Sequence, residues 1–341
     1  MMFTKENISY YIFAFALIAI SSYVGNKFKQ NFVEYDTKDD YEMVRKYLLN
    51  DSPLYGYNKP KIWIHSKYEV NARVWKNFQS RNTTDLNQPY LYLTVQTIIN
   101  HCGDDFHVCL IDDETFGKLI PTWDIDLTTT VEPMRSHYRN LGMAQLVYYY
   151  GGLVIPNSFL CTRSLTGLSK KAFVVEEINR TKASGRFIPG IAILGAPKND
   201  PTIKELVNYL KGLYHSGHFT SEMDFMGDIS NWCSDRVKEN KLELVDGSLI
   251  GIKTVKKKTI LLDDLMEEGF LDIDPNIFGI LIPRDELLRR PKYQWFSILP
   301  HEEVLKASTI LSKYFKSSMV DGVNEYQKKN NITGTRSISS I

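Results

Sequence analysis

The chain has 341 residues, of which 43% are hydrophobic and 24% are charged, and its formal net charge is +1. These values are ordinary for a globular protein of one large domain or two small ones. The balanced charge gives no basis for a nucleic-acid-binding protein, which would carry a marked excess of Lys and Arg.

The first predicted element is an uncharged, apolar run over residues 8–24. At roughly 17 residues it is at the short end of what spans a bilayer. Tyr10, Tyr11 and Tyr23 lie near its ends, where interfacial aromatic side chains are favoured. A cleaved signal peptide and a buried core helix are the alternatives. We expect a single transmembrane helix that anchors the chain within residues 1–26, followed by a polar stem over 27–58.

The next elements alternate between strand and helix. A compact apolar strand is predicted over 61–65, after Pro60, with His65 and Ser66 at its end. Apolar residues at helical spacing predict a helix over 90–100, and a second strand is predicted over 106–111.

Asp112 and Asp113 follow that second strand and look like a metal-binding pair in isolation. A short helix is predicted immediately afterwards, over 115–120. An aspartate that accepts backbone N–H bonds at a helix start is the more ordinary role. Both interpretations remain open at this point.

A longer helix is predicted over 135–150, and Gly151 and Gly152 end it because glycine adopts a left-handed cap without steric cost. Residues 153–155 then form a short buried strand. Pro156 removes a backbone donor and stops this strand early.

The rest of the chain continues the same alternation of strands and helices. This pattern predicts an α/β fold with a sheet covered on both faces, in one domain over 59–317. Further strands are predicted at 188–197, 242–245 and 259–262, helices at 201–214 and 301–315, a segment carrying Asp224 and Asp228 at 219–235, and a mobile tail at 318–341.

Four cysteines, Cys102, Cys109, Cys161 and Cys233, have no CxxC or Cys/His metal spacing. Cys102 and Cys109 could form a disulfide in an oxidising compartment. The alternative is that they are small buried residues that flank a strand.

The stretch Tyr148-Tyr149-Tyr150-Gly151-Gly152 resembles the tyrosine–glycine–glycine core of the DXD-containing glycosyltransferases. The nearest groups are the mannosyltransferase-like sugar transferases and the capsular polysaccharide synthesis proteins. The resemblance implies a GT-A-like, Rossmann-related domain with a mainly parallel sheet. In these enzymes the strand after the turn delivers aspartates to a divalent metal on a nucleotide-sugar diphosphate.

The sequence departs from this family where the family's chemistry takes place. Pro156 and Ser158 occupy the two acidic positions of the family pattern, with Asn157 between them. Further upstream, Asn140 and Met143 replace a family aspartate and arginine. Hard divalent cations prefer carboxylate oxygens, which Ser and Asn lack. We therefore expect no metal at this turn and no cofactor, unless Mn²⁺ is held by carboxylates from elsewhere, such as Asp112 and Asp113.

Two functions follow from the resemblance and the departures. One is an atypical or inactive glycosyltransferase relative with a binding or structural role. The other is an active, metal-independent transferase that moves a sugar from a nucleotide-sugar to a glycan or protein acceptor. Arginines would then stabilise the leaving diphosphate. The expected nucleotide-sugar-binding residues are His65, Ser66, Arg73, Arg81, Asp112, Asp113, Arg135, Arg139, Gly151, Gly152, Asn157 and Ser158, and the weak candidates for a catalytic base are Asp224 and Asp228.

The expected partners are a membrane, a nucleotide-sugar and a glycan acceptor, with no nucleic acid. The expected location is an endomembrane (ER or Golgi), as the family resemblance implies, or a viral membrane. The viral alternative rests on residues 80–90, which look like those of uncharacterised family members in large DNA viruses.

Overall fold

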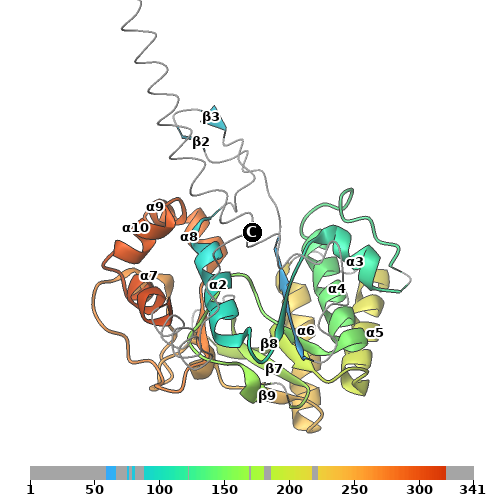
Figure 1. Ribbon diagram of the computed structural model, residues 1–341. Helices are drawn as coiled ribbons and strands as arrows, with labels where there is room; N and C mark the ends of the chain where they lie inside the picture. The colour runs from blue at the N-terminus through green and yellow to red at the C-terminus, as the bar shows by residue number, and fades with distance from the viewer. Residues whose placement is uncertain are drawn as a thin grey trace, which may run out of the picture. The chain divides into compact units, whose positions relative to one another are not determined.

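The computed structural model describes residues 59–66, 75–76, 79–80, 88–121, 123–168, 170–179, 186–216 and 222–319 (Figure 1). The predicted anchor, the stem and all but the first two residues of the predicted tail lie outside these ranges. No helix in the described ranges is long and apolar enough to cross a membrane.

The described residues form a mixed α/β structure around a six-stranded sheet with strand order β4-β1-β5-β8-β7-β9. β1 pairs in parallel with both β4 and β5, which confirms that the three strands predicted before residue 156 lie in one sheet. β8 is antiparallel to β5 and β7, and β9 is parallel to β7. The strands are β1 (Lys61–His65), β4 (His107–Ile111), β5 (Gly152–Val154), β7 (Phe173–Asn179), β8 (Arg186–Ala196) and β9 (Glu243–Val245).

The helices that connect the parallel strands lie on opposite faces of the sheet (Figure 1). α2 (Tyr90–Cys102) follows β1 and leads to β4, whereas α3 (Asp113–Leu119) and α4 (Met134–Tyr150) lead from β4 to β5. Trp63 of β1 belongs to the hydrophobic core on the α4 side. Tyr90 of α2 belongs to a separate core that includes Ile280. The chain therefore passes from β1 to β4 over one face of the sheet and from β4 to β5, on the other side of β1, over the opposite face.

The second core combines α2 and β6 (Phe159–Cys161) with short elements from the C-terminal part of the chain. β6 pairs antiparallel with β10 (Gly279–Leu281).

The remaining elements are β2 (Trp75–Lys76) and β3 (Gln79–Ser80), the 3-10 turns η1 (Thr166–Leu168) and η2 (Gly247–Ile250), and the helices α5 (Pro201–Ser216), α6 (Glu222–Lys238), α7 (Leu262–Met266), α8 (Arg284–Arg289), α9 (Gln294–Ser297) and α10 (His301–Lys306).

Two predicted elements near the C-terminus are wrong. Residues 259–262 form no strand: Thr259 makes a single bridge to Lys253, and α7 begins at Leu262. Asp264 accepts the N–H of Leu261 at 2.8 Å and thereby starts a helix where the apolar run suggested a strand.

The predicted helix over 301–315 is divided in two. α10 ends at Lys306, and a second helix covers residues 310–319. Thr309 accepts the N–H of Ser312 at 3.1 Å, as a residue that caps a helix start does.

All four cysteines are buried and free. Cys102 Sγ lies 3.9 Å from Cys161 Sγ, so its cysteine neighbour is not the Cys109 considered from the sequence.

The turn at Gly151 and Gly152 fixes β5 against β1. Both residues have positive φ, 71° and 103°. A Cβ on Gly152 would lie 2.2 Å from the carbonyl oxygen of Lys61, which is far inside contact distance. Trp63 Nε1 donates to the carbonyl of Gly151 at 2.9 Å. Glycine is required here by the backbone conformation and by the closeness of β1.

Gly152→Ala is expected to destabilise the protein by about 2–5 kcal/mol, since it combines backbone strain with an overlap that only backbone movement relieves. Gly212→Ala is the matched control. Gly212 lies within α5, and a Cβ there would meet nothing within 4 Å. It should stabilise the protein by about 0.5–1 kcal/mol. Urea unfolding of both variants measures this, and equal stabilities would contradict the steric argument.

Candidate functional site

The carboxyl ends of β4, β1 and β5 meet at one edge of the sheet. His65 pairs with Ile111 of β4, and Trp63 pairs with Val154 of β5. The residues that follow these strands therefore come together at this edge. Because β1 connects to neighbours on both sides, the edge is a topological switch point, where open α/β sheets bind their ligands.

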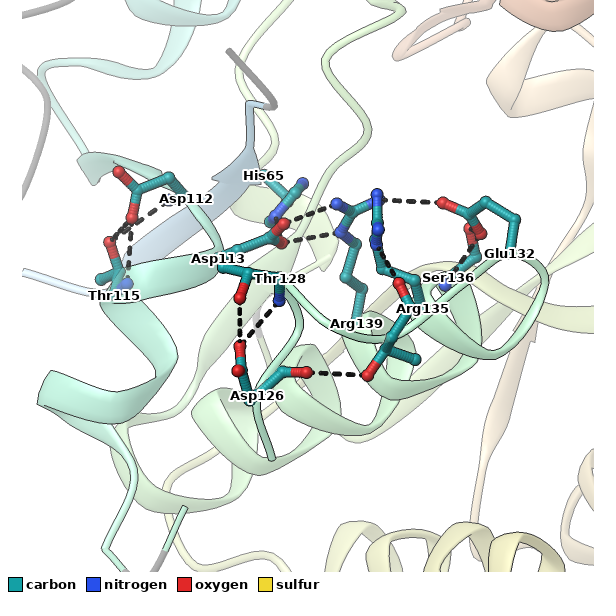
Figure 2. Close-up of polar contacts among 11 residues, drawn as sticks. His65, Asp112, Asp113, Thr115, Asp126, Thr128, Glu132, Arg135, Ser136 and Arg139 are labelled. Carbon is teal, nitrogen blue, oxygen red and sulfur yellow. Dashed lines mark hydrogen bonds and ion pairs between the residues drawn. The ribbon is translucent and has the colours of Figure 1, made fainter. Parts of the chain in front are cut away.

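A hydrogen-bonded network of three side chains occupies one side of this edge (Figure 2). Asp113 Oδ1 lies 2.9 Å from His65 Nε2 and accepts from Arg139 Nε at 2.7 Å. Arg139 Nη2 donates to the other carboxylate oxygen at 2.5 Å. The end of β1, the first residue of α3 and the second turn of α4 are thus tied together through one carboxylate.

The surroundings of this network compensate the charge of Arg139. Glu132 Oε1 lies 3.5 Å from Arg139 Nη1, so the guanidinium faces two carboxylates. The His65 ring stacks on Phe116 with 5.7 Å between centroids. Through Asp113, Arg139 holds α4 against β1. Its positive charge is largely compensated by the carboxylates of Asp113 and Glu132.

The protonation states of the network follow from burial and hydrogen bonding. Burial lowers the pKa of His65, and the hydrogen bond to Asp113 offsets this only in part. Burial alone would raise the pKa of Asp113, but hydrogen bonds from Arg139 and His65 outweigh it and hold that pKa far below its usual range. At neutral pH the network therefore contains a neutral imidazole, a carboxylate and a guanidinium.

The neighbouring carboxylate, Asp112, has a different role. Its side chain accepts the N–H of Thr115 at 2.9 Å, and the Thr115 hydroxyl accepts the N–H of Asp112. This capping box starts α3. The predicted helix cap is confirmed for Asp112, whereas Asp113 turns toward His65 and Arg139.

Arg135 and Ser66 make local contacts with the backbone and take no part in the network. Arg135 Nε donates to the carbonyl of Thr130 at 2.8 Å, so this arginine orders the loop before α4. Ser66 is buried, and its N–H donates to the carbonyl of Ile111. Arg73 and Arg81 lie outside the described residues.

The other side of the edge is formed by the turn after β5. The N–H of Phe159 donates to the carbonyl of Pro156 at 3.0 Å, which closes a β-turn with Asn157 and Ser158 at its centre. Both central residues are buried. The hydroxyl of Thr94, on α2, donates to the Asn157 carbonyl and fastens the turn to that helix.

Arg284 is a residue at this turn that the sequence prediction missed. Its Nη1 donates to Asn157 Oδ1 at 3.2 Å. Arg284 reaches this turn through a long-range strand pairing. β10 runs antiparallel to β6, and Ile282, the residue after β10, donates its N–H to the Ser158 carbonyl. A single sequence does not show which distant strand pairs with which.

Both predicted base candidates belong to α6. Asp228 is on α6, where its backbone carbonyl accepts from the Tyr209 hydroxyl at 3.2 Å. Among the described residues no hydrogen bond or ion pair joins Asp228 to His65, Asp113 or Arg139. Asp224 lies on the first turn of the same helix. Within the described ranges there is no group of three or more His, Cys, Asp or Glu residues that could hold a metal ion.

No protein-family model matches the sequence. No curated protein matches it either. Three solved structures that resemble the chain are glycosyltransferases. The PaToxG glycosyltransferase is 11% identical, with 60% of this chain and 80% of that chain covered and a TM-score of 0.35. GlyE of Streptococcus pneumoniae TIGR4 is 13% identical, with 83% and 66% covered and a TM-score of 0.41. The galactosyltransferase LgtC is 12% identical, with 56% and 75% covered and a TM-score of 0.30. At such TM-scores, any assignment of function depends on the chain's own residues.

Asp113→Asn should destabilise the protein by about 1–3 kcal/mol at neutral pH, because it removes a charged acceptor shared by two donors. The Asp113 pKa is lower in the folded state than in the unfolded state. Its stabilisation is therefore present above the unfolded-state pKa of about 3.9 and is lost as pH falls toward the folded-state pKa. Unfolding in urea between about pH 7 and pH 2 should show a steeper acid-side loss in the wild type than in Asp113→Asn.

Asp124→Asn serves as the control for this series. Asp124 is an exposed residue of the loop before α4. Its replacement should change the free energy of unfolding by less than about 0.5 kcal/mol. If Asp113→Asn behaved like this control, the network would have no structural role.

Proposed function

We propose that this chain is a glycosyltransferase-like protein with a GT-A-type domain that binds a nucleotide-sugar at the carboxyl edge of β4, β1 and β5 without a divalent metal. One observation carries the proposal. The turn Pro156-Asn157-Ser158 is separated from β5 by Ile155, whose N–H donates to the carbonyl of Trp63, and it therefore lies at the switch point of the sheet, near the end of β1. This is the place where the tyrosine–glycine–glycine resemblance implies a nucleotide-sugar.

The chemistry of this turn disfavours a divalent cation. Asn157 and Ser158 provide neutral oxygens, and Asn157 Oδ1 already accepts from the Arg284 guanidinium. Mg²⁺ and Mn²⁺ prefer several carboxylate oxygens. A fixed positive charge at the same place would repel them. The nucleotide-sugar site, if occupied, must therefore neutralise the diphosphate with side chains.

The domain is then an atypical relative that binds rather than transfers. The resemblance places a family aspartate and arginine at Asn140 and Met143, and neither can act as its counterpart does. An active metal-independent transferase is the second candidate. The observation that favours it is the half-exposed Arg284 guanidinium beside Asn157, whose positive charge could stabilise a leaving diphosphate. It would require a base such as Asp224 or Asp228.

Nucleotide-sugar binding should be independent of divalent metal. Calorimetry with UDP-sugars and GDP-sugars is expected to give the same affinity in Mn²⁺ and in EDTA, because the turn offers no carboxylate. Micromolar binding that requires Mn²⁺ would refute metal-independent binding.

If binding did require Mn²⁺, the variant Asp112→Ala would show whether the Asp112 carboxylate helps to hold the metal. Asp112 caps α3, and its carboxylate is the one nearest in sequence to the network. If Mn²⁺-dependent binding appeared and Asp112→Ala abolished it, a metal site built on a different strand would be real. A radiochemical assay for sugar transfer or nucleotide-sugar hydrolysis then distinguishes the binding protein from the active enzyme.

We also propose that the uncharged run over residues 8–24 anchors the chain in an endomembrane or viral membrane. Its length and its terminal tyrosines support this role. Deletion of residues 1–30 should release the protein into the soluble fraction after cell lysis, since the remaining chain has no second run of this kind. Persistent tight membrane association of the truncated protein would show that the anchor lies elsewhere.

A further inference from the structure

The position of Arg284 is fixed from three directions. The antiparallel pairing of β10 with β6 continues through the hydrogen bond from Ile282 to Ser158 and brings the start of α8 to the turn after β5. Leu287 of α8 belongs to the same hydrophobic core as Tyr90 of α2. The guanidinium then meets Asn157. This arrangement holds an arginine at the carboxyl edge of the sheet.

The charge of Arg284 is poorly compensated compared with that of Arg139. Among the described residues the carboxylate within ion-pair distance of Arg284 is Asp285, at 3.7 Å, and its side chain is 70% exposed. A solvated pair at such a distance contributes little. The hydrogen-bond partner at Asn157 is neutral. Arg139, by contrast, donates two hydrogen bonds to one carboxylate.

The guanidinium is also accessible and has donors to spare. The Arg284 side chain is 41% exposed, and one of its five N–H groups is used by Asn157. Planar arginine donors match phosphate oxygens in pairs. An anion that approaches this edge therefore finds donors that are not already taken up by a carboxylate.

A buried hydroxyl lies close to the same charge. Tyr90 is fully buried, and its hydroxyl has no hydrogen-bond partner within the described part of the chain. Burial raises the pKa of Tyr90, while the nearby positive charge of Arg284 acts in the opposite direction. A buried hydroxyl without a partner is costly, and a bound water would remove that cost.

We infer that Arg284 binds the diphosphate of the nucleotide-sugar, in the place where a metal-dependent relative would hold its cation. This inference rests on the proposed function and names the group that makes metal-free binding possible. The order of events is simple: Asn157 orients the guanidinium, and the free N–H groups donate to phosphate oxygens. No bond is made or broken.

The test compares the full-length wild type with Arg284→Gln and Arg289→Gln by calorimetry in EDTA, with UDP, GDP and inorganic pyrophosphate as ligands. Arg289 is the exposed last residue of the same helix, so its replacement removes the same charge from the same element. Arg284→Gln is expected to weaken binding about 10- to 100-fold, the effect of losing a charged hydrogen-bond donor. Arg289→Gln should bind as the wild type does.

Asn157→Asp provides a second, independent variant. A carboxylate at this position would pair with Arg284 and neutralise it, so binding in EDTA should weaken as it does in Arg284→Gln. Thermal unfolding of each variant checks that the fold is retained. Full affinity in Asn157→Asp would overturn the inference even if Arg284→Gln failed to fold.

The possible results separate this inference from the function on which it rests. If the wild type binds UDP or GDP and Arg284→Gln binds equally well, the Arg284 inference is overturned and the proposed function survives. If pyrophosphate binds through Arg284 but no nucleotide binds, Arg284 is a diphosphate-binding residue and the proposed function fails. If the wild type binds none of the three ligands, both are overturned.

Discussion

The close approach of Gly152 to β1 is the constraint on which the site depends. With a Cβ position only 2.2 Å from the Lys61 carbonyl, the chain can pass at this depth only as glycine. The hydrogen bond from Trp63 to Gly151 locks the same contact from the other strand. Because β5 is held here in register with β1, the next residues, Pro156 to Ser158, arrive at the carboxyl edge beside His65. The position of Asn157 follows from this contact, and the pairing of β10 with β6 then brings Arg284 to it.

The parallel half of the sheet could be predicted because its strands are short, buried and apolar, and are bounded by Pro60, by Asp112 and by the two glycines. The antiparallel half was harder. β7 carries Glu176 and Glu177 within a buried strand, which weakens any apolar pattern, and its pairing with β8 shifts register between Val174 and Val175. Glu177 accepts the N–H of Ala192 at 2.7 Å, so a long-range hydrogen bond compensates a residue that locally argues against a strand.

The candidate site could be predicted from the sequence only where its residues follow a strand of the parallel half. Residues at the ends of the parallel strands were found because strand ends can be identified locally. The different roles of Asp112 and Asp113 could not be predicted, because adjacent side chains at a helix start point in different directions. Asp112 bonds to its own helix, whereas Asp113 bonds to α4. Arg284 was missed for a stronger reason. It is 127 residues from Asn157 in sequence, and only the pairing of β10 with β6 joins them.

Electrostatics explains why neutral residues suit the turn after β5. A carboxylate at Asn157 would lie within hydrogen-bond reach of the Arg284 guanidinium and would form an ion pair in a mostly buried turn. Such a pair, like that of Asp113 with Arg139, would leave little positive charge for a ligand. An amide orients the guanidinium through a neutral oxygen and leaves its charge in place. The edge therefore contains two arginines in opposite situations. Arg139 is neutralised and structural, whereas Arg284 is oriented but uncompensated, and it is the second situation that a bound anion requires.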